Sequence, residues 1–190
     1  LPIKAQLQYY ASQFDSAELN GVFYRTPTPD AVKSWRDQTG KNFTFTWKAS
    51  KFITHWKRLS ANSANSLELL EDRLSYLGDK AGPVLFQLPP NFRADADRLS
   101  AFLRMLPRKR RYSFEFRHPS WYAPQIMRIL AEKIHINGGS VCLRTTNSPS
   151  LPNKVGRHFH LDDFFRIEDE SGPGFIRAFR RAMTQDPPRP

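Results

Sequence analysis

The sequence is poor in cysteine and has no long apolar run. Its single cysteine, Cys142, excludes an internal disulfide. Because Cys142 lies in the apolar run 140–143, we expect a small core residue rather than a nucleophile. No apolar run approaches the ~20 residues that cross a bilayer, so we expect no membrane span. The chain begins at Leu1 without an initiator methionine or a secretory signal pattern. We therefore expect a cytoplasmic protein whose sequence once began earlier.

The sequence lacks several motifs that are typical of cofactor-binding and metal-binding proteins. No G-x-G-x-x-G follows a predicted strand, and there is no P-loop, which argues against a dinucleotide-binding sheet. The sequence also lacks the H-E-x-x-H and H-x-x-x-H spacings, zinc-finger spacings, a basic zipper and an RNP-type strand. We therefore predict no cofactor and no metal.

Acidic residues are outnumbered by basic ones. The 18 Asp and Glu residues face 29 Lys and Arg residues, which gives a formal net charge of +11. This excess favours anionic partners such as phosphate esters, nucleic acid or an acidic protein. A basic surface with no dedicated partner is the alternative. The densest clusters, residues 104–111 and 177–181, lack the interleaved aromatic residues of a single-strand binding platform.

What the sequence does contain is a regular alternation of two hydrophobic periods. Helical spacing predicts helices over residues 4–14, 30–38, 67–77, 99–106 and 126–134. Alternating or continuous apolar runs predict strands over residues 16–20, 43–48, 83–88, 112–117 and 141–145. Helix–strand alternation at this spacing predicts βαβ crossovers and a parallel sheet. The connection over residues 49–61 has no strong period.

Two α/β architectures fit this order, an open doubly wound sheet and an arc of a (β/α) barrel. Polar residues at nearly every strand end favour the barrel, because barrel enzymes place their chemistry there. We therefore predict an incomplete TIM-type barrel over residues 1–146, with about five parallel strands. Residues 147–190 are predicted to be a divergent segment with short helices over 161–167 and 175–183 and a disordered proline-rich tail.

The polar strand ends are expected to meet at one mouth, since residues two apart on a strand share a face. The residues concerned are Glu18, Asn20, Lys48, Gln87, Glu115, Arg117 and Arg144. In one interpretation, Lys48 and Arg117 hold a substrate anion and a carboxylate acts as general acid or base. In the other, the carboxylates only neutralise the cations inside the barrel. A glycosidase pair also needs two carboxylates, at a separation that no sequence shows.

Two histidines lie on loops that follow the predicted strands, where barrel enzymes carry functional groups. His55 follows the strand that ends at Lys48, and His118 follows the strand that contains Glu115. We take these histidines as candidates for proton transfer, with loop packing as the alternative. Tyr24 either covers the pocket or packs beneath it.

Four stretches identify the chain as similar to the YecE-like family, known as domain of unknown function 72. In order, they are AELNGVFYRTP, FTFTWKASKFITHWKRL, GPVLFQLPPNF and YSFEFRHPSWY, within a match over residues 7–145. The resemblance implies a (β/α) barrel and a bacterial or archaeal, cytosolic setting, but no established reaction. Its matching polar positions are Glu18, Asn20, Tyr24, Lys48, Thr54, His55, Gln87, Glu115, Arg117, His118 and Trp121.

The sequence departs from the family pattern at both ends. Members begin with a strand that contains Gly-Trp, and they carry a later Arg-Leu-His-Gly motif; neither is found here.

Three hypotheses about function follow from the sequence. The first is an acid–base enzyme, a hydrolase or lyase, acting on a small anionic, phosphate- or sugar-like substrate. The second is a nucleic-acid-associated protein that uses its basic clusters, and the third is an inactive truncated barrel.

For the enzyme, the predicted roles divide into two groups. The predicted catalytic residues are Glu18, His55, Glu115 and His118. The predicted substrate-binding residues are Asn20, Tyr24, Lys48, Gln87, Arg117, Trp121 and Arg144.

Overall fold

The computed structural model describes residues 3–108, 110–137, 141–145 and 165–167, and within them helices and strands alternate. The strands are β1 (Ser16–Leu19), β2 (Thr44–Lys48), β3 (Ala81–Gln87), β4 (Tyr112–Phe116), β5 (Val141–Thr145) and β6 (Phe165–Ile167). The α-helices are α1 (Ile3–Gln13), α2 (Pro29–Asp37), α3 (Ala64–Ser75), α4 (Ala96–Met105) and α5 (Pro124–Asn137). The helices and strands predicted up to residue 145 are present, with ends that differ by a few residues.

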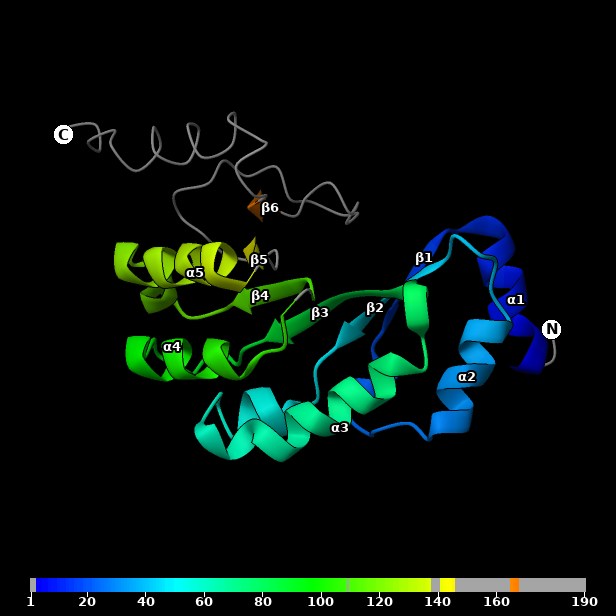
Figure 1. The fold of residues 1–190 in the computed structure, drawn as a ribbon, viewed down its shortest axis with the longest axis horizontal. Helices are drawn as coiled ribbons and strands as arrows, with labels where there is room; N and C mark the ends of the chain where they lie inside the picture. Colours follow the sequence, from blue (N-terminus) through cyan, green and yellow to red (C-terminus); the bar gives the residue numbers. More distant parts are fainter. Residues whose placement is uncertain (1–2, 109, 138–140, 146–164, 168–190) are drawn as a thin grey trace.

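The strands form one sheet whose order follows the chain, from β1 to β6. Strands β1 to β5 are parallel, and each is joined to the next by a connection that contains a helix. A doubly wound sheet reverses its strand order at a switch point, and this sheet does not. Helices α2, α3, α4 and α5 follow one another in an arc around the strands (Figure 1). The architecture is therefore that of a (β/α) barrel, and the sheet formed by the described strands is not closed.

The last described strand runs against the others. β6 pairs antiparallel with β5, with Val141 opposite Ile167. The helix predicted over residues 161–167 is therefore wrong for residues 165–167. Phe165 and Ile167 flank Arg166, a period-2 pattern that suits a strand, and pairing with a sheet edge overrides a weak helical pattern. The predicted helix over 175–183 and the proline-rich tail lie outside the described residues.

The two faces of the sheet differ in polarity. Phe45 and Trp47 of β2 and Val84 and Phe86 of β3 are buried in one core with apolar residues of the helices. The helices contribute Val32, Leu67, Leu70, Leu74, Leu99, Phe102, Leu103, Ile126 and Leu130 to this core. Alternate positions point to the other face, the interior of the arc. That inner face carries the polar side chains described below.

Local signals position the elements that carry these side chains. The Thr28 hydroxyl accepts a hydrogen bond from the backbone N–H of Ala31, which caps α2, and Asp95 caps α4 through the N–H of Arg98. Gly82 lets β3 approach β2 closely, because a Cβ there would lie 2.8 Å from the Phe45 carbonyl oxygen. These contacts set the helix starts and the strand spacing on which the inner face depends.

The connection after β2 contains a π-helical turn, η2 (Phe52–Trp56). After its C-cap Lys57, two consecutive residues have left-handed backbone, Arg58 at φ 47° and Leu59 at φ 58°. Side chains with a Cβ rarely adopt this conformation, and each such residue costs on the order of 1 kcal/mol. Leu59 is fully buried, so the core holds the strained turn in place.

Candidate functional site

Strand register brings the predicted polar positions onto the inner face of the sheet. Glu18 lies opposite Thr46, Lys48 lies opposite Leu85, and Gln87 lies opposite Glu115. Because the strands are parallel, their carboxyl ends open at one mouth. Two groups of side chains face this mouth, and they differ in how their charges are paired.

The first group is the carboxylate cluster, formed by Gln87, Glu115 and Arg117. The Glu115 side chain is 1% exposed. The Gln87 amide donates to both of its oxygens at 3.0 Å, and Arg117 Nε donates to Oε1 at 2.8 Å. Burial of a carboxylate is tolerated when hydrogen bonds and an opposite charge compensate it. The cluster therefore holds Arg117 in a fixed position at the rim, where its side chain is 37% exposed.

The second group is the cationic cluster, formed by Lys48, Lys51, His55 and Arg58. Lys48 Nζ lies 3.4 Å from Asn20 Oδ1 and 5.0 Å from the centre of the Phe23 ring. Among the described residues, none of its three permanent cations forms an ion pair. Neutral groups and rings are therefore the partners of this cluster that the structure places.

Positive charges from both clusters act on His55. Its pKa is lowered from 6.5, first by burial and then by positive charges, namely those of Arg117, Lys48, Lys51 and Arg58. Its Nδ1 lies 2.9 Å from Thr54 Oγ1, and its ring lies edge-on to Phe23 at 5.2 Å. The sequence-based prediction placed His55 and Lys48 in one pocket, and the structure brings them together.

His118 is held differently. The backbone N–H of Ser120 donates to His118 Nδ1 at 3.2 Å, so this nitrogen caps the short helix η5 (Pro119–Tyr122). The Ser120 hydroxyl accepts from the N–H of Ala94 at 2.8 Å and so joins the loops after β3 and β4. His118 thus has an observed role in loop structure, and its proposed part in catalysis stays a prediction.

Trp121 and Tyr24 lie in opposite environments. Trp121 is fully buried, stacked on Phe116 at 4.7 Å, and its indole N–H donates to the Phe92 carbonyl at 2.6 Å. Its contacts are those of a core residue, and its predicted role in substrate binding stays untested. Tyr24 is 71% exposed beside Phe23. It lies at the surface of the mouth and does not pack beneath it.

The two candidate carboxylates do not form a close pair. Glu18 lies on β1 and Glu115 on β4, three strand spacings of about 4.8 Å apart. Through the register, Glu18 also lies four residues earlier along the strand direction than Glu115. Glycosidase carboxylates are about 5–9.5 Å apart, so this arrangement does not suit that chemistry. Arg144 lies opposite Glu115 in the register of β4 and β5.

Sequence reasoning missed Lys51, Arg58 and Tyr122. The signal for the first two was the stretch KFITHWKR, which interleaves cations with aromatic residues within one loop. The Tyr122 hydroxyl donates to the Phe116 carbonyl at 2.7 Å, and burial and the nearby Glu115 charge raise the pKa of this phenol. No spacing in the sequence pointed to Tyr122, because its position depends on the fold of the loop after β4.

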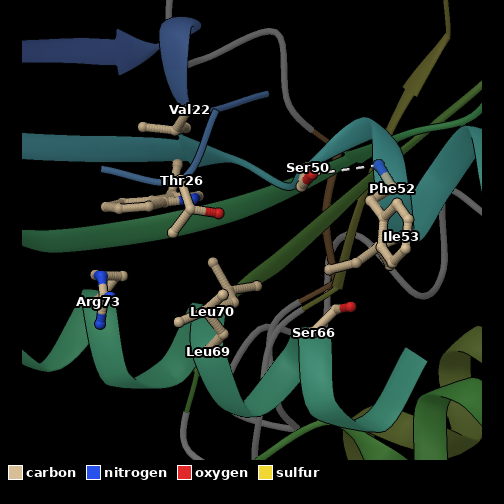
Figure 2. Close-up of a pocket in the computed structure, with 10 residues that line it drawn as sticks. Val22, Thr26, Ser50, Phe52, Ile53, Ser66, Leu69, Leu70 and Arg73 are labelled. Carbon is tan, nitrogen blue, oxygen red and sulfur yellow. Dashed lines mark hydrogen bonds between the residues drawn. The ribbon is translucent and has the colours of Figure 1, made fainter. Parts of the chain in front are cut away.

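A separate cavity of about 230 Å³ lies on the helix side of β2, between η2 and α3. Figure 2 shows Leu69, Leu70 and Arg73 of α3 facing Val22 and Thr26 across it. Arg73, the charged residue in its lining, is engaged elsewhere, because it donates to the Pro27 carbonyl and pairs with Asp72. The cavity contains none of the predicted site residues, so the polar mouth remains the candidate site.

The described part of the chain lacks two other kinds of site. No group of three or more His, Cys, Asp and Glu side chains there could hold a metal ion. No helix there is long and apolar enough to cross a membrane.

Of the basic cluster at residues 104–111, Arg110 pairs with Glu71 at 2.9 Å, and Lys109 lies outside the described residues. Nucleic-acid binding by this cluster stays a prediction.

The strand order, the helices on one face and the polar carboxyl ends define the class of this protein as a (β/α)-barrel protein, whose described strands form an open arc. The chain belongs to the family described as "Protein of unknown function DUF72", whose sequence profile matches residues 1–161. The match extends beyond the interval 7–145 that the motifs indicated, and past the predicted domain boundary at residue 146.

Relatives in two bacteria are similar in sequence. The UPF0759 protein YecE of Escherichia coli K12 is 35% identical over 118 residues, which cover 62% of this chain and 43% of YecE. The UPF0759 protein YunF of Bacillus subtilis is 29% identical over 127 residues, covering 63% of this chain and 45% of YunF. The chain thus spans less than half the length of the curated relatives it matches.

Two crystal structures of DUF72 family proteins share the fold. That of Thermotoga maritima superposes with a TM-score of 0.61 at 23% identity, covering 74% of this chain and 55% of the other. That of Enterococcus faecalis gives a TM-score of 0.56 at 22% identity, covering 71% and 52% of the two chains. At this identity the likeness establishes the fold alone.

Proposed function

We propose that the mouth of this incomplete barrel binds a small phosphate-type anion and uses His55 for proton transfer on it. One observation carries the proposal: His55 and Lys48 lie against the same Phe23 ring, at 5.2 and 5.0 Å, and the pKa of this half-buried imidazole is lowered first by burial and then by four cationic side chains. Three of them have no carboxylate partner among the described residues. A bound anion would satisfy these charges, and charge-assisted hydrogen bonds to phosphate are among the stronger polar contacts.

Lys48 and Arg117 are the proposed anchors of the anion. Each is oriented before any ligand arrives, Lys48 by Asn20 and Phe23 and Arg117 by Glu115. Such preorganisation lowers the entropic cost of binding. Glu115 is proposed as a positioning residue and not as the base, because both of its oxygens already accept hydrogen bonds.

His55 is proposed as the proton acceptor. A lowered pKa keeps its ring neutral near pH 7, as a general base requires. Thr54 Oγ1 lies 3.4 Å from the Ser50 carbonyl oxygen, which can only accept, and 2.9 Å from His55 Nδ1. When Thr54 donates to that carbonyl, His55 Nδ1–H donates to Thr54, and the lone pair on Nε2 is free to accept a proton. The chemistry would be that of a hydrolase or lyase acting on a phosphate ester.

The binding step is tested by calorimetric titration of the full chain with inorganic phosphate. Lys48→Ala and Arg117→Ala should each weaken binding about tenfold, the equivalent of ~1.4 kcal/mol. Lys33→Ala is the matched control, because Lys33 also lies over an aromatic ring, that of Tyr76, but sits on helix α2. Failure of wild type to bind phosphate, or an equal loss in the control, would overturn the proposal.

The proton-transfer step is tested separately with a panel of phosphate esters. His55→Gln should retain phosphate affinity within about twofold, because the anchors remain, but lose turnover of any ester that wild type converts. Turnover that survives in His55→Gln would remove His55 from the reaction and leave the binding site intact. Absence of turnover by wild type across the panel would count against the proton-transfer step.

A further inference from the structure

Three exposed aromatic side chains lie together beside the mouth, and one of them, Phe52, also lines the cavity on the helix side of β2. Tyr24, Phe52 and Trp56 are 71%, 41% and 65% exposed, and they come from the loops after β1 and β2. We call them the aromatic platform. Large apolar side chains grouped at a surface mark an interaction site more often than single ones do. Their position beside the cationic cluster therefore requires an explanation.

Cations are interleaved with the rings of the platform. Lys51 Nζ lies 5.4 Å from the centre of the Tyr24 ring and 5.3 Å from that of Trp56. Phe52 meets Trp56 edge-on at 5.3 Å, and Lys57 Nζ lies 4.7 Å from the Phe52 ring. Alternation of positive charges with exposed rings is the pattern by which proteins bind the phosphates and stacked bases of single-stranded nucleic acid.

The platform is continuous with the proposed anion site. The Phe23 ring packs edge-on against the Tyr24 ring, with the ring centres 5.0 Å apart. The same ring lies 5.2 Å from the centre of the His55 ring and 5.0 Å from Lys48 Nζ. One ring therefore links the anchor of the anion to the first ring of the platform. A ligand with its phosphate beside Lys48 could lay a flat ring on Tyr24 or Trp56.

We infer that the ligand of this mouth is a phosphorylated nucleoside, with the phosphate in the cationic cluster and the base stacked on the aromatic platform. The inference rests on the proposed function and names its substrate class. A sugar phosphate without a base would leave the platform unused, and a purely apolar partner would leave the interleaved cations without counter-charges. The nucleoside unit can belong to a free nucleotide or to a single strand, since both present the same phosphate and base.

The test compares AMP with ribose 5-phosphate in titrations of the full chain. AMP should bind at least about tenfold more tightly, because its base can stack on an aromatic side chain and ribose 5-phosphate has no base. Trp56→Ala should remove most of this advantage and leave ribose 5-phosphate affinity unchanged. Tyr9→Ala, which removes a 57% exposed ring on α1, is the control and should change neither affinity.

The outcomes separate the two proposals. If neither ligand binds, the proposed anion site itself fails. If both bind equally, or if Trp56→Ala weakens both equally, the anion site stands and the nucleoside inference is overturned. A single-stranded oligonucleotide is the third ligand. Tighter, strongly salt-dependent binding of the strand than of AMP assigns the unit to a nucleic acid, and weaker binding assigns it to a free nucleotide.

Discussion

The two clusters at the mouth differ in how their charged side chains are paired. In the carboxylate cluster, Glu115 is almost fully buried and its oxygens accept hydrogen bonds from Gln87 and Arg117. In the cationic cluster, Lys48, Lys51 and Arg58 have rings and an amide as partners and no ion pair with a described residue. The carboxylate cluster contributes to a fixed structure and holds one proposed anion anchor, Arg117, in place, whereas the under-neutralised cluster is the proposed place for the ligand. The difference predicts which mutations affect stability and which affect binding.

The largest expected effect lies beneath the carboxylate cluster. Trp121→Ala should destabilise the chain by about 3–5 kcal/mol, because it leaves a cavity beside Phe116 and Phe92. Urea denaturation measures the change. Trp121→Phe keeps most of the packing but leaves the Phe92 carbonyl without its donor, so it should cost about 1–2 kcal/mol. A loss below 1 kcal/mol for Trp121→Ala would show that Trp121 is not a core residue.

Removal of the Glu115 carboxylate should have the next largest effect. Glu115→Ala leaves Gln87 without an acceptor and Arg117 without its partner, at a cost of about 2–3 kcal/mol. Glu71→Ala is the matched control, since the pair of Glu71 and Arg110 has a similar distance, 2.9 Å, but is about a quarter exposed. It should cost at most about 1 kcal/mol. Equal losses in the two variants would contradict the contrast between a buried and a surface pair.

A smaller effect is expected at the strained turn of the cationic cluster. Arg58→Gly relieves the left-handed backbone at φ 47° and should be more stable than Arg58→Ala by about 1 kcal/mol. Both variants remove the same positive charge, so both should weaken phosphate binding equally. Thermal unfolding and phosphate titration measure the two effects. A glycine variant no more stable than the alanine variant would mean that the turn relaxes without strain.

The smallest effect concerns the dependence of stability on pH. Since the pKa of His55 is lowered in the folded state, the unfolded chain takes up a proton near pH 6.5 that the folded chain does not. This residue therefore makes stability fall as the pH drops below 6.5, and full stability is present above it. His55→Gln should flatten the stability profile between pH 6.5 and 5, measured by urea denaturation. An unchanged slope would mean that neither burial nor the four cations lower the pKa of His55.

The element order and the strand ends were predictable from the sequence because they follow local rules. The continuous apolar run of β3 and the alternation of β2 indicate strands, and their polar final residues, Gln87 and Lys48, follow from the same patterns. The inner face of the arc could also be predicted, since it depends on the period of two. These rules correctly placed Lys48, Gln87 and Glu115 on one face.

The pairing of charges was not predictable from the sequence. Whether a carboxylate is buried and saturated, as Glu115 is, or exposed, as Glu18 is, depends on its strand's place in the sheet. The π-helical turn brings Lys51 and Arg58 to the mouth through a strained backbone that no propensity favours. Trp121 shows the reverse case, because a residue predicted to bind substrate is buried in the core and stacked on Phe116.

The central claim is that the positive charges at the mouth await an anion, and His55 reports on them directly. NMR titration of the imidazole, assigned among the 5 histidines with His55→Gln, gives its pKa with and without phosphate. The account predicts a pKa below 6.5 in phosphate-free buffer and a rise on saturation with phosphate, because a bound anion offsets the charges of Arg117, Lys48, Lys51 and Arg58. A pKa at or above 6.5 without phosphate, or one that phosphate does not move, would contradict it.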